Sequence, residues 1–327
     1  MIRAAVCPEY GPPEIVRIEE QPPQALSDGQ VRVRVAAAAV NYPDVLLVAG
    51  KYQISVPPPF VVGSEFAGVV VEVAAGTGDL AVGDRVTGTG MYGAFAEEVV
   101  VAPGGLARIP DGVDDRTAAA LGVAHRTAYH TLRSVARVSS GDALIVLGAG
   151  GGVGLAAVQL GVALGAEVTA VASSAEKLDA AALYGAHHLV NHRSGDLRAG
   201  LREAVPDGAD AVVDPVGGDL SEPALRSLRR GGRFVTVGYA SGVIPRIPLN
   251  LVLVKGVQVV GFQFQDVAPD EFARNESELG ELLTTGAVRP HIGAVYPLAE
   301  TPRALREVAD GKAVGKVLID VGAREER

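Results

Sequence analysis

The sequence predicts an α/β protein in which a mostly-β unit is followed by a parallel sheet with helices between its strands. Two patterns carry this prediction. As far as about Arg116 the chain shows short Val-rich runs interrupted by Gly and Pro, which favour short strands. From about Thr117 apolar runs of four to six residues alternate with helical segments of ten or more, as in right-handed βαβ units. The length of 327 residues suits about two domains.

Each unit has runs of strand length. In the first unit they are Val31–Val35, Gly68–Val73, Arg85–Gly88 and Ala96–Val101. In the second they are Ala143–Leu147, Glu167–Ala172, His188–Asn191, Ala211–Val216, Arg233–Gly238 and Val257–Phe262, with helices expected near Gly152–Leu164, Ala175–Tyr184, Asp196–Val205 and Leu220–Arg229. Six strands in this alternation predict the doubly wound sheet that binds dinucleotides.

The tail of the chain changes pattern again. It shows a helix near Pro269–Thr285, an extended segment Ile292–Pro297, a helix near Thr301–Asp310 and a last strand Gly315–Val321. We expect this tail to rejoin the first unit. The predicted domains are therefore residues 1–117 with 268–327, and residues 118–267.

The composition excludes several classes of protein. Hydrophobic residues make up 48% of the chain and charged residues 20%, so the chain can bury a full core. The net charge of −9 has the wrong sign for a broad nucleic-acid surface, and we expect no nucleic-acid partner. Cys7 is the only cysteine, which rules out an intrachain disulfide and a cysteine-rich zinc site and favours a reducing compartment.

Two segments bear on localisation. The start, MIRAAVCPEYG, lacks the basic flank and apolar run of a secretory signal, so we expect a cytoplasmic protein. The 24 uncharged residues from Ala143 to Ala166 are long enough to cross a bilayer. However, this stretch holds seven glycines, and four of them lie between Gly150 and Gly154, where a phosphate-binding turn requires them. We therefore expect no membrane segment.

A glycine turn joins the first strand of the second unit to its helix. The pattern is Ala149-x-Gly151-x-x-Gly154, with alanine at the first position. A strand before it and a helix after it are the context of a dinucleotide-binding turn. Gly151 allows the backbone to approach a pyrophosphate, Gly154 allows close packing of helix and strand, and the N–H groups of Gly152 and Val153 at the helix start face the anion. The alternative is a tight turn that binds nothing.

The end of the second strand indicates which nucleotide binds. NAD enzymes place an acid there to hold the ribose diol, but this chain has Ala172-Ser173-Ser174. Ser173, Ser174 and Lys177 offer two hydroxyls and a cation for a 2′-phosphate, and His192 with Arg193 would complete the pocket. The sequence predicts NADPH. Alternatively, Ser173 caps the next helix and Lys177 only faces solvent.

Several further motifs occur in order along the chain. They are Asn41-Tyr-Pro-Asp44, Gly63-Ser-Glu65, Gly68-Val-Val-Val-Glu-Val73, Val82-Gly-Asp-Arg-Val86, Thr127-Ala-Tyr129, Ala149–Gly154, Asp214-Pro-Val-Gly-Gly218 and Gly231-Gly-Arg233. With these motifs, essentially the whole chain resembles the medium-chain dehydrogenase/reductase superfamily. It is most similar to the zinc-independent NADPH:quinone oxidoreductase, or zeta-crystallin-like, family. The resemblance implies a GroES-like catalytic domain made from both chain ends and a central six-stranded Rossmann domain.

The resemblance also bears on metal use. Zinc-dependent relatives carry a Cys where this chain has Asn41 and a His where it has Ser64. Both ligands are replaced, so we expect no metal. Without a Lewis acid, oxidation of simple alcohols is disfavoured, and reduction of an activated acceptor remains.

The same resemblance implies roles for individual residues. Asn41, Tyr42 and Tyr52 line the substrate pocket, and Tyr52 matches the position of a proton-donating tyrosine in related enoyl reductases. Alternatively, Tyr52 only packs at the domain edge and Asn41 bonds a loop. Glu65 braces the pocket floor, while Asp44 and Asp214 are mainly structural. The cofactor side adds Thr127 beside the nicotinamide, Gly238, and Phe262 with Gln263 beside the carboxamide.

Three functions are compatible with these residues. The first is an NADPH-dependent reductase of a quinone. The second is an NADPH-dependent reductase of α,β-unsaturated ketones or enoyl thioesters, for which a basic patch would bind the carrier phosphates. The third is an NADPH-binding protein with minor catalytic activity. In each case the apolar strand Val257–Phe262 is expected at a sheet edge, where it would pair two copies into a homodimer.

Overall fold

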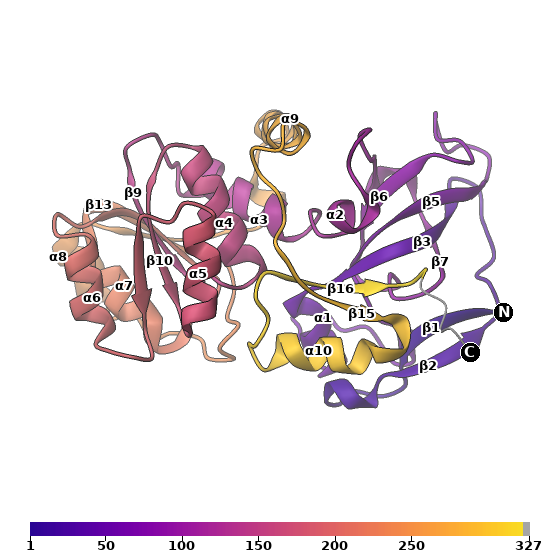
Figure 1. Ribbon diagram of the computed structural model, residues 1–327, viewed down its shortest axis with the longest axis horizontal. Coiled ribbons are helices and arrows are strands. Elements are labelled where there is room, and N and C mark those ends of the chain that lie inside the picture. The colour runs from indigo at the N-terminus through magenta and orange to yellow at the C-terminus, as the bar shows by residue number, and fades with distance from the viewer. Residues whose placement is uncertain (323–327) are drawn as a thin grey trace. The chain divides into compact units, whose positions relative to one another are not determined.

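The computed structural model describes residues 1–322, which form two compact units (Figure 1). One unit comprises Met1–Val123 together with the chain from Ile292 onward, and the other comprises Ala124–His291. The predicted α/β class, with a mostly-β unit and a six-stranded parallel sheet, is confirmed.

The first unit is built from two sheets. The larger has the order β15-β16-β3-β5-β6-β8, with β7 paired to β3, and the smaller has the order β2-β1-β4. The strands are β1 (Ile2–Cys7), β2 (Arg17–Gln21), β3 (Val31–Val40), β4 (Phe60–Val61), β5 (Glu65–Val73), β6 (Arg85–Thr89), β7 (Glu98–Val101), β8 (Leu106–Arg108), β15 (Ile292–Pro297) and β16 (Lys316–Asp320). The helices are α1 (Tyr42–Val48), α2 (Asp115–Ala119) and α10 (Thr301–Ala309).

Strand β3 is the centre of this unit. Val31, Val33 and Val35 point to the core in the alternation that the strand period requires, and all three are buried. Near its end β3 pairs with β16, Val40 lying opposite Val317. This pairing brings the tail of the chain beside residues that lie near its beginning.

The second unit is a six-stranded parallel sheet with helices on its faces. The strand order is β11-β10-β9-β12-β13-β14, and every neighbouring pair is parallel. The strands are β9 (Ala143–Leu147), β10 (Glu167–Ala172), β11 (His188–Asn191), β12 (Ala209–Asp214), β13 (Leu228–Thr236) and β14 (Gln258–Gly261). The helices are α3 (Ala124–His130), continued by a π-helix (Thr131–Val135), α4 (Gly152–Ala163), α5 (Ala175–Leu183), α6 (Leu197–Ala204), α7 (Ser221–Arg226), α8 (Leu249–Lys255) and α9 (Pro269–Thr284). The order is that of a doubly wound sheet.

Both boundaries between the two units lie later in the chain than the predicted domain boundaries. Helix α9, which the sequence pattern assigns to the catalytic domain, belongs to the second unit. The cause is a set of polar contacts with α3: Arg126 and His130 both contact Glu276, and the Tyr129 hydroxyl donates to Glu278. Sequence periodicity carries no information about such contacts between distant helices.

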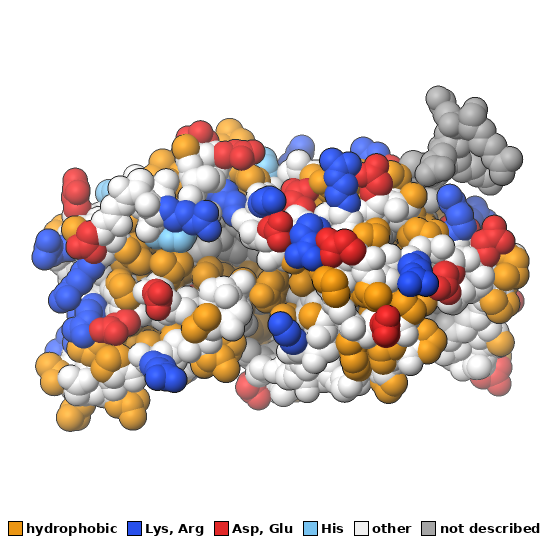
Figure 2. All heavy atoms as spheres, turned by 90° about the horizontal axis from the view of Figure 1, so that it is seen from below, with side chains coloured by type: hydrophobic (Ala, Val, Ile, Leu, Met, Phe, Trp, Pro, Cys, Tyr) orange, Lys and Arg blue, Asp and Glu red, His pale blue; other side chains and the backbone are white. Residues whose placement is uncertain are grey.

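Within residues 1–322, no helix is long and apolar enough to cross a membrane, and the uncharged stretch Ala143–Ala166 divides into β9, the glycine turn and α4. In Figure 2, basic (blue) and acidic (red) side chains are scattered over the face among hydrophobic and other groups.

Candidate active site

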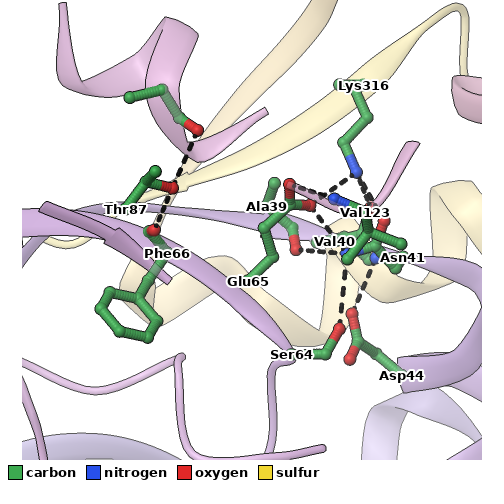
Figure 3. Close-up of polar contacts among 11 residues, drawn as sticks. Ala39, Val40, Asn41, Asp44, Ser64, Glu65, Phe66, Thr87, Val123 and Lys316 are labelled. Atoms are coloured by element: carbon green, nitrogen blue, oxygen red, sulfur yellow. Dashed lines mark hydrogen bonds and ion pairs between the residues drawn. The ribbon is translucent and has the colours of Figure 1, made fainter. Parts of the chain in front are cut away.

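A buried polar cluster occupies the first unit where β3, β5 and β16 meet the start of α1 (Figure 3). We define the polar cluster as Asn41, Asp44, Ser64, Glu65 and Lys316. Each of these side chains is at most 7% exposed. Charged groups are rarely buried unless they are paired, so the partners of each decide what the cluster does.

Lys316 begins β16 and places an ammonium group in the middle of the cluster. Its Nζ donates to Asn41 Oδ1 (2.6 Å), to Glu65 Oε2 (3.1 Å) and to the Val40 carbonyl (3.3 Å). An ammonium has three donors, and all three are used here. The positive charge is thus held in one place by three fixed acceptors.

Asn41 lies between the end of β3 and the start of α1, and both ends of its amide are engaged. Oδ1 accepts from Lys316, while Nδ2 donates to Glu65 Oε2 at 3.0 Å. Nδ2 also contacts the Ala39 carbonyl at 3.3 Å and Ser64 Oγ at 3.4 Å. The amide orientation is therefore set by the ion pair beside it.

Glu65 connects the polar cluster to Gly122 and Val123, at the end of the segment Met1–Val123 of the first unit. Its Oε1 accepts from the Val123 N–H at 2.8 Å. Gly122 leaves no room for a side chain, because a Cβ there would lie 2.7 Å from Thr89 Cγ2 and 3.1 Å from Glu65 Oε1. Glu65 thus braces the polar cluster against the segment that leads into the second unit.

Asp44 stands in the first turn of α1 and is fully buried. Its Oδ2 accepts from the Asn41 N–H at 2.7 Å, so it caps the helix start. Burial raises the pKa of Asp44 to about 7, although the Asn41 N–H bond opposes this shift. The carboxyl is therefore poised to change its charge near neutral pH.

The two tyrosines predicted on the acceptor side lie in different surroundings. Tyr42 is the first residue of α1 and is half-buried, and burial raises the pKa of its phenol. Tyr52 packs against the core of the first unit and lines a small cavity with Tyr10 and Leu47. The packing that the sequence offers as an alternative for Tyr52 is thus present. Roles of both tyrosines in catalysis stay predictions.

The glycine turn of the second unit has the tight geometry that its sequence predicts. A Cβ on Gly154 would lie 2.0 Å from the Gly148 carbonyl oxygen, so only glycine fits. The Gly151 N–H donates to the same oxygen at 3.0 Å, and Ala149 N–H bonds the Val171 carbonyl of β10. Gly151 is the N-cap of α4. The N–H groups of the first helical turn have no intrahelical partners, which makes this end suited to an anion.

One basic side chain, that of Lys177, lies against this turn. A Cβ on Gly150 would lie 2.4 Å from Lys177 Cβ, so the lysine stem runs across the turn. Burial, and then the charge of Arg193, lower the pKa of Lys177, and the same causes together with Lys177 lower the pKa of His192. Like charges brought together in this way favour an anionic ligand. Lys177 is therefore a neighbour of the turn, and the binding of a 2′-phosphate by Lys177, His192 and Arg193 stays a prediction.

The sequence offers Ser173 as the cap of the helix that follows β10, but another residue has this role. Ser174, not Ser173, is the N-cap of α5, and its Oγ accepts from the Lys177 N–H at 3.4 Å. Ser173 comes directly before it, where β10 has ended. The capping role therefore falls to a residue that the NADPH prediction also uses.

The remaining predicted cofactor residues lie in separate elements of the second unit. Thr127 is in α3, and Gly238 follows β13 with its N–H on the Asp214 carbonyl (3.4 Å). Phe262 follows β14, is buried, and meets the Phe264 ring edge to face. Gln263 comes next and is exposed. Their contacts with a cofactor stay predictions.

Asp214 is structural, as expected. Its carboxylate accepts from the N–H groups of Val216 and Gly217, both at 2.8 Å, and from Ser221 Oγ at 2.6 Å. These bonds fix the loop after β12.

Sequence reasoning missed Lys316. The available signal was a lysine at the start of an otherwise apolar last strand, Lys316-Val-Leu-Ile. That signal does not reveal its partners, because Lys316 and Asn41 are 275 residues apart.

Comparisons with known proteins give two family matches. Residues 152–280 match the family described as zinc-binding dehydrogenase, and residues 27–111 match the alcohol dehydrogenase GroES-like domain. A quinone oxidoreductase-like protein 2 from Bos taurus is 36% identical over 324 residues, which is 98% of this chain and 92% of that protein. The polyketide synthase GfsB from Streptomyces halstedii is 35% identical over 297 residues, 90% of this chain but 5% of that protein.

A solved structure shows the same fold over the whole chain. The Escherichia coli quinone oxidoreductase complexed with NADPH superposes with a TM-score of 0.90 and 27% sequence identity, covering 98% of this chain and 100% of that one.

Proposed function

The chain belongs to the quinone oxidoreductase family of the medium-chain dehydrogenase/reductase superfamily, and we propose that it reduces a quinone with hydride from NADPH and without a metal ion. The observation that carries the proposal is the basic cluster beside the glycine turn. The stem of Lys177 crosses the turn, and Lys177 interacts electrostatically with Arg193 and His192. The residues at and just after the end of β10, Ala172-Ser173-Ser174, include no acid. The NADPH complex of the E. coli relative supports it.

The chain's own residues fit this cofactor. When bound, NADPH supplies a hydride from its dihydronicotinamide ring. We assign the pyrophosphate to the glycine turn and the start of α4, and the 2′-phosphate to the end of β10 with the basic cluster. The residues are Ala149, Gly151, Gly152, Val153 and Gly154 for the first group, Ser173, Ser174, Lys177 and His192 for the second, and Thr127, Gly238, Phe262 and Gln263 for the nicotinamide end.

The polar cluster does not suit a zinc ion. The side chains at the two positions where zinc-dependent relatives carry Cys and His are an amide and a hydroxyl, Asn41 and Ser64. The Lys316 ammonium lies 2.6 Å from the amide oxygen, where a second cation would be repelled. Among residues 1–322 no three His, Cys, Asp or Glu side chains form a group that could hold a metal. The proposed reaction therefore uses no metal ion.

The first unit supplies the acceptor side. A quinone spreads incoming negative charge over its ring and oxygens, so the protein has mainly to orient it and to place donors at the developing oxyanion. We assign this work to Asn41, Tyr42 and Tyr52. Tyr52 is the candidate proton donor, because a phenol hydroxyl is among the groups that act as general acids.

A second function is favoured by one finding. The polyketide synthase match covers 90% of this chain, and such a match fits a reductase of enoyl thioesters. The same residues would then orient an α,β-unsaturated carbonyl compound. A third reading, an NADPH-binding protein with minor catalytic activity, uses only the second unit's site.

The test compares acceptors under anaerobic conditions. NADPH oxidation by the purified protein is followed with a simple 1,4-quinone and with a short enoyl-CoA, each matched by an NADH control. We expect rapid oxidation with NADPH and the quinone, and little with NADH. Faster turnover of the enoyl-CoA would favour the second function, and NADPH binding without turnover would favour the third.

We also propose a cytoplasmic homodimer. Cys7, the only cysteine, is a buried free thiol, which suits a reducing compartment. Strand β14 is the last strand of the six-stranded sheet and pairs, among the described residues, only with β13. Val259 in β14 is 42% exposed, so an unpaired strand edge with an apolar residue lies open to a second copy.

A further inference from the structure

Packing alone does not explain why a charged ammonium group, that of Lys316, is buried in the polar cluster. It is 3% exposed and lies at the start of β16, whose next three residues are buried and apolar. Burying an ion pair such as Lys316–Glu65 costs desolvation energy, and well-packed apolar residues often give equal or greater stability. The geometry therefore calls for a role of this charge beyond stability.

The ammonium decides which way the Asn41 amide faces. An amide can turn so that its oxygen and nitrogen exchange places, and its neighbours determine the orientation. Lys316 carries only donors, so it requires Oδ1, and the resulting bond of 2.6 Å is short and charge-assisted. With Oδ1 held, Nδ2 must point to the opposite side, toward Glu65, Ser64 and the Ala39 carbonyl.

One of the two Nδ2 hydrogens is only loosely held. Glu65 Oε2 takes the first at 3.0 Å, an ordinary hydrogen-bond length. The remaining contacts, to the Ala39 carbonyl and Ser64 Oγ, are 3.3 and 3.4 Å, beyond the usual range for an N–H donor. This second N–H therefore lacks a strong acceptor and is available to one that comes within reach, such as a developing oxyanion.

The charge also strengthens that donor. A cation bound to the amide oxygen withdraws electron density through the amide and makes its N–H groups more acidic. It also compensates Glu65, whose bare carboxylate would otherwise repel negative charge that develops near Asn41. Orientation and charge thus act in the same direction.

We propose that Lys316 is a positioning residue, which holds and polarises the Asn41 amide so that an Nδ2 hydrogen is directed to the oxyanion of the reduced acceptor. This role rests on the proposed function, and it applies equally to a quinone and to an unsaturated carbonyl compound. It assigns to an ammonium ion, acting through an amide, part of the electrostatic work that a metal performs in zinc-dependent relatives.

The test is a set of variants with kinetic and stability measurements. Lys316→Met removes the charge, Glu65→Gln removes its partner, and the double variant restores neutrality to the cluster. Asn41→Ala removes the amide, and Asn41→Ala with Lys316→Met tests whether the lysine acts through it. Lys255→Met is the matched control, because Lys255 Nζ also donates to a backbone carbonyl, that of Arg226 in the second unit. Melting temperature, NADPH affinity, and kcat and KM for the acceptor are measured for each.

We expect Lys316→Met with Glu65→Gln to melt near the wild-type temperature and to bind NADPH normally, with kcat lowered by roughly 10²-fold, as when one oxyanion donor is lost. The losses from Asn41→Ala and Lys316→Met should not multiply, because the second acts through the first. Lys255→Met should keep wild-type kcat.

Three results would overturn the role. The first is a Lys316→Met, Glu65→Gln double variant with the kcat of the wild type. The second is a pair of kcat losses, from Asn41→Ala and from Lys316→Met, that multiply when the two substitutions are combined. The third is a Lys316→Met variant whose only defect is weaker NADPH binding. A wild-type protein that turns over neither acceptor overturns the proposed function and this role together, whereas the three results above overturn this role alone.

Discussion

The Asp44 carboxyl shows how burial, as the largest of several influences, can raise a pKa toward neutrality. With its pKa raised to about 7 from an ordinary value near 4, the folded protein holds this proton more tightly than the unfolded chain does. The contribution of Asp44 to stability is therefore fully present below about pH 4. It is lost as pH rises through about 7, because the carboxylate must then ionise without water.

Replacing Asp44 by Asn should remove this pH dependence. The side-chain oxygen of Asn can still accept from the Asn41 N–H, but it cannot ionise. We expect wild-type stability to fall relative to Asp44→Asn by on the order of 2 kcal/mol between about pH 5 and about pH 8. Thermal unfolding at several pH values measures this difference.

Asp114→Asn is the matched control. Asp114 also caps a helix, but hydrogen bonds from Thr117 lower its pKa despite partial burial, so it stays ionised over this range. Wild-type and Asp44→Asn curves that run parallel with pH would contradict the account.

Lys177 should distinguish the two nicotinamide cofactors. If it contacts the 2′-phosphate, Lys177→Ala should weaken NADPH binding by about 1.5 to 3 kcal/mol, the usual worth of a hydrogen bond to a charged group. NADH lacks that phosphate and serves as the internal control. Fluorescence titration with both nucleotides gives the ratio, and an equal loss for both would refute the assignment.

At the scale of elements, the turn between β9 and α4 depends on close backbone contact. Gly154→Ala would place a Cβ 2.0 Å from the Gly148 oxygen, so the helix start must shift away from the strand. We expect a loss of about 3 kcal/mol in the free energy of unfolding, together with loss of NADPH binding. Chemical denaturation and nucleotide titration measure both effects.

Gly280→Ala in α9 is the comparison. A Cβ there meets nothing within 4 Å, so this substitution should stabilise the protein by about 0.5 to 1 kcal/mol. Equal effects of the two substitutions would mean that the turn does not depend on the absence of a side chain.

At the scale of the whole molecule, the open edge of β14 predicts assembly. Val259→Lys places a charge on this edge, a device by which natural proteins prevent edge pairing. Sedimentation velocity should show a wild-type dimer and a Val259→Lys monomer. Leu183→Lys, at a residue of α5 that is 74% exposed, should leave the dimer intact. A monomeric wild-type protein, or a Val259→Lys dimer, would contradict the proposal.

The sequence alone predicts the parts of this molecule that depend on short-range pattern. The six strands of the parallel sheet follow from runs such as Ala143–Leu147, and the glycine turn follows from spacing within a few residues. Helices α1, α2, α3 and α8 and the π-helix after α3 were not predicted. Each is a short segment in which a helical period is hard to recognise. Contacts across long separations were not predictable: Lys316 meets Asn41 from the other end of the chain, and Glu276 ties α9 to the second unit.

We propose, above all, that this chain reduces an activated acceptor with NADPH and without a metal. The most direct test is anaerobic quinone-dependent oxidation of NADPH by protein dialysed against a strong chelator, with its metal content measured. We expect an unchanged rate in metal-depleted protein, and no increase when Zn²⁺ is added. Activity that disappears on dialysis and returns with Zn²⁺ would contradict it.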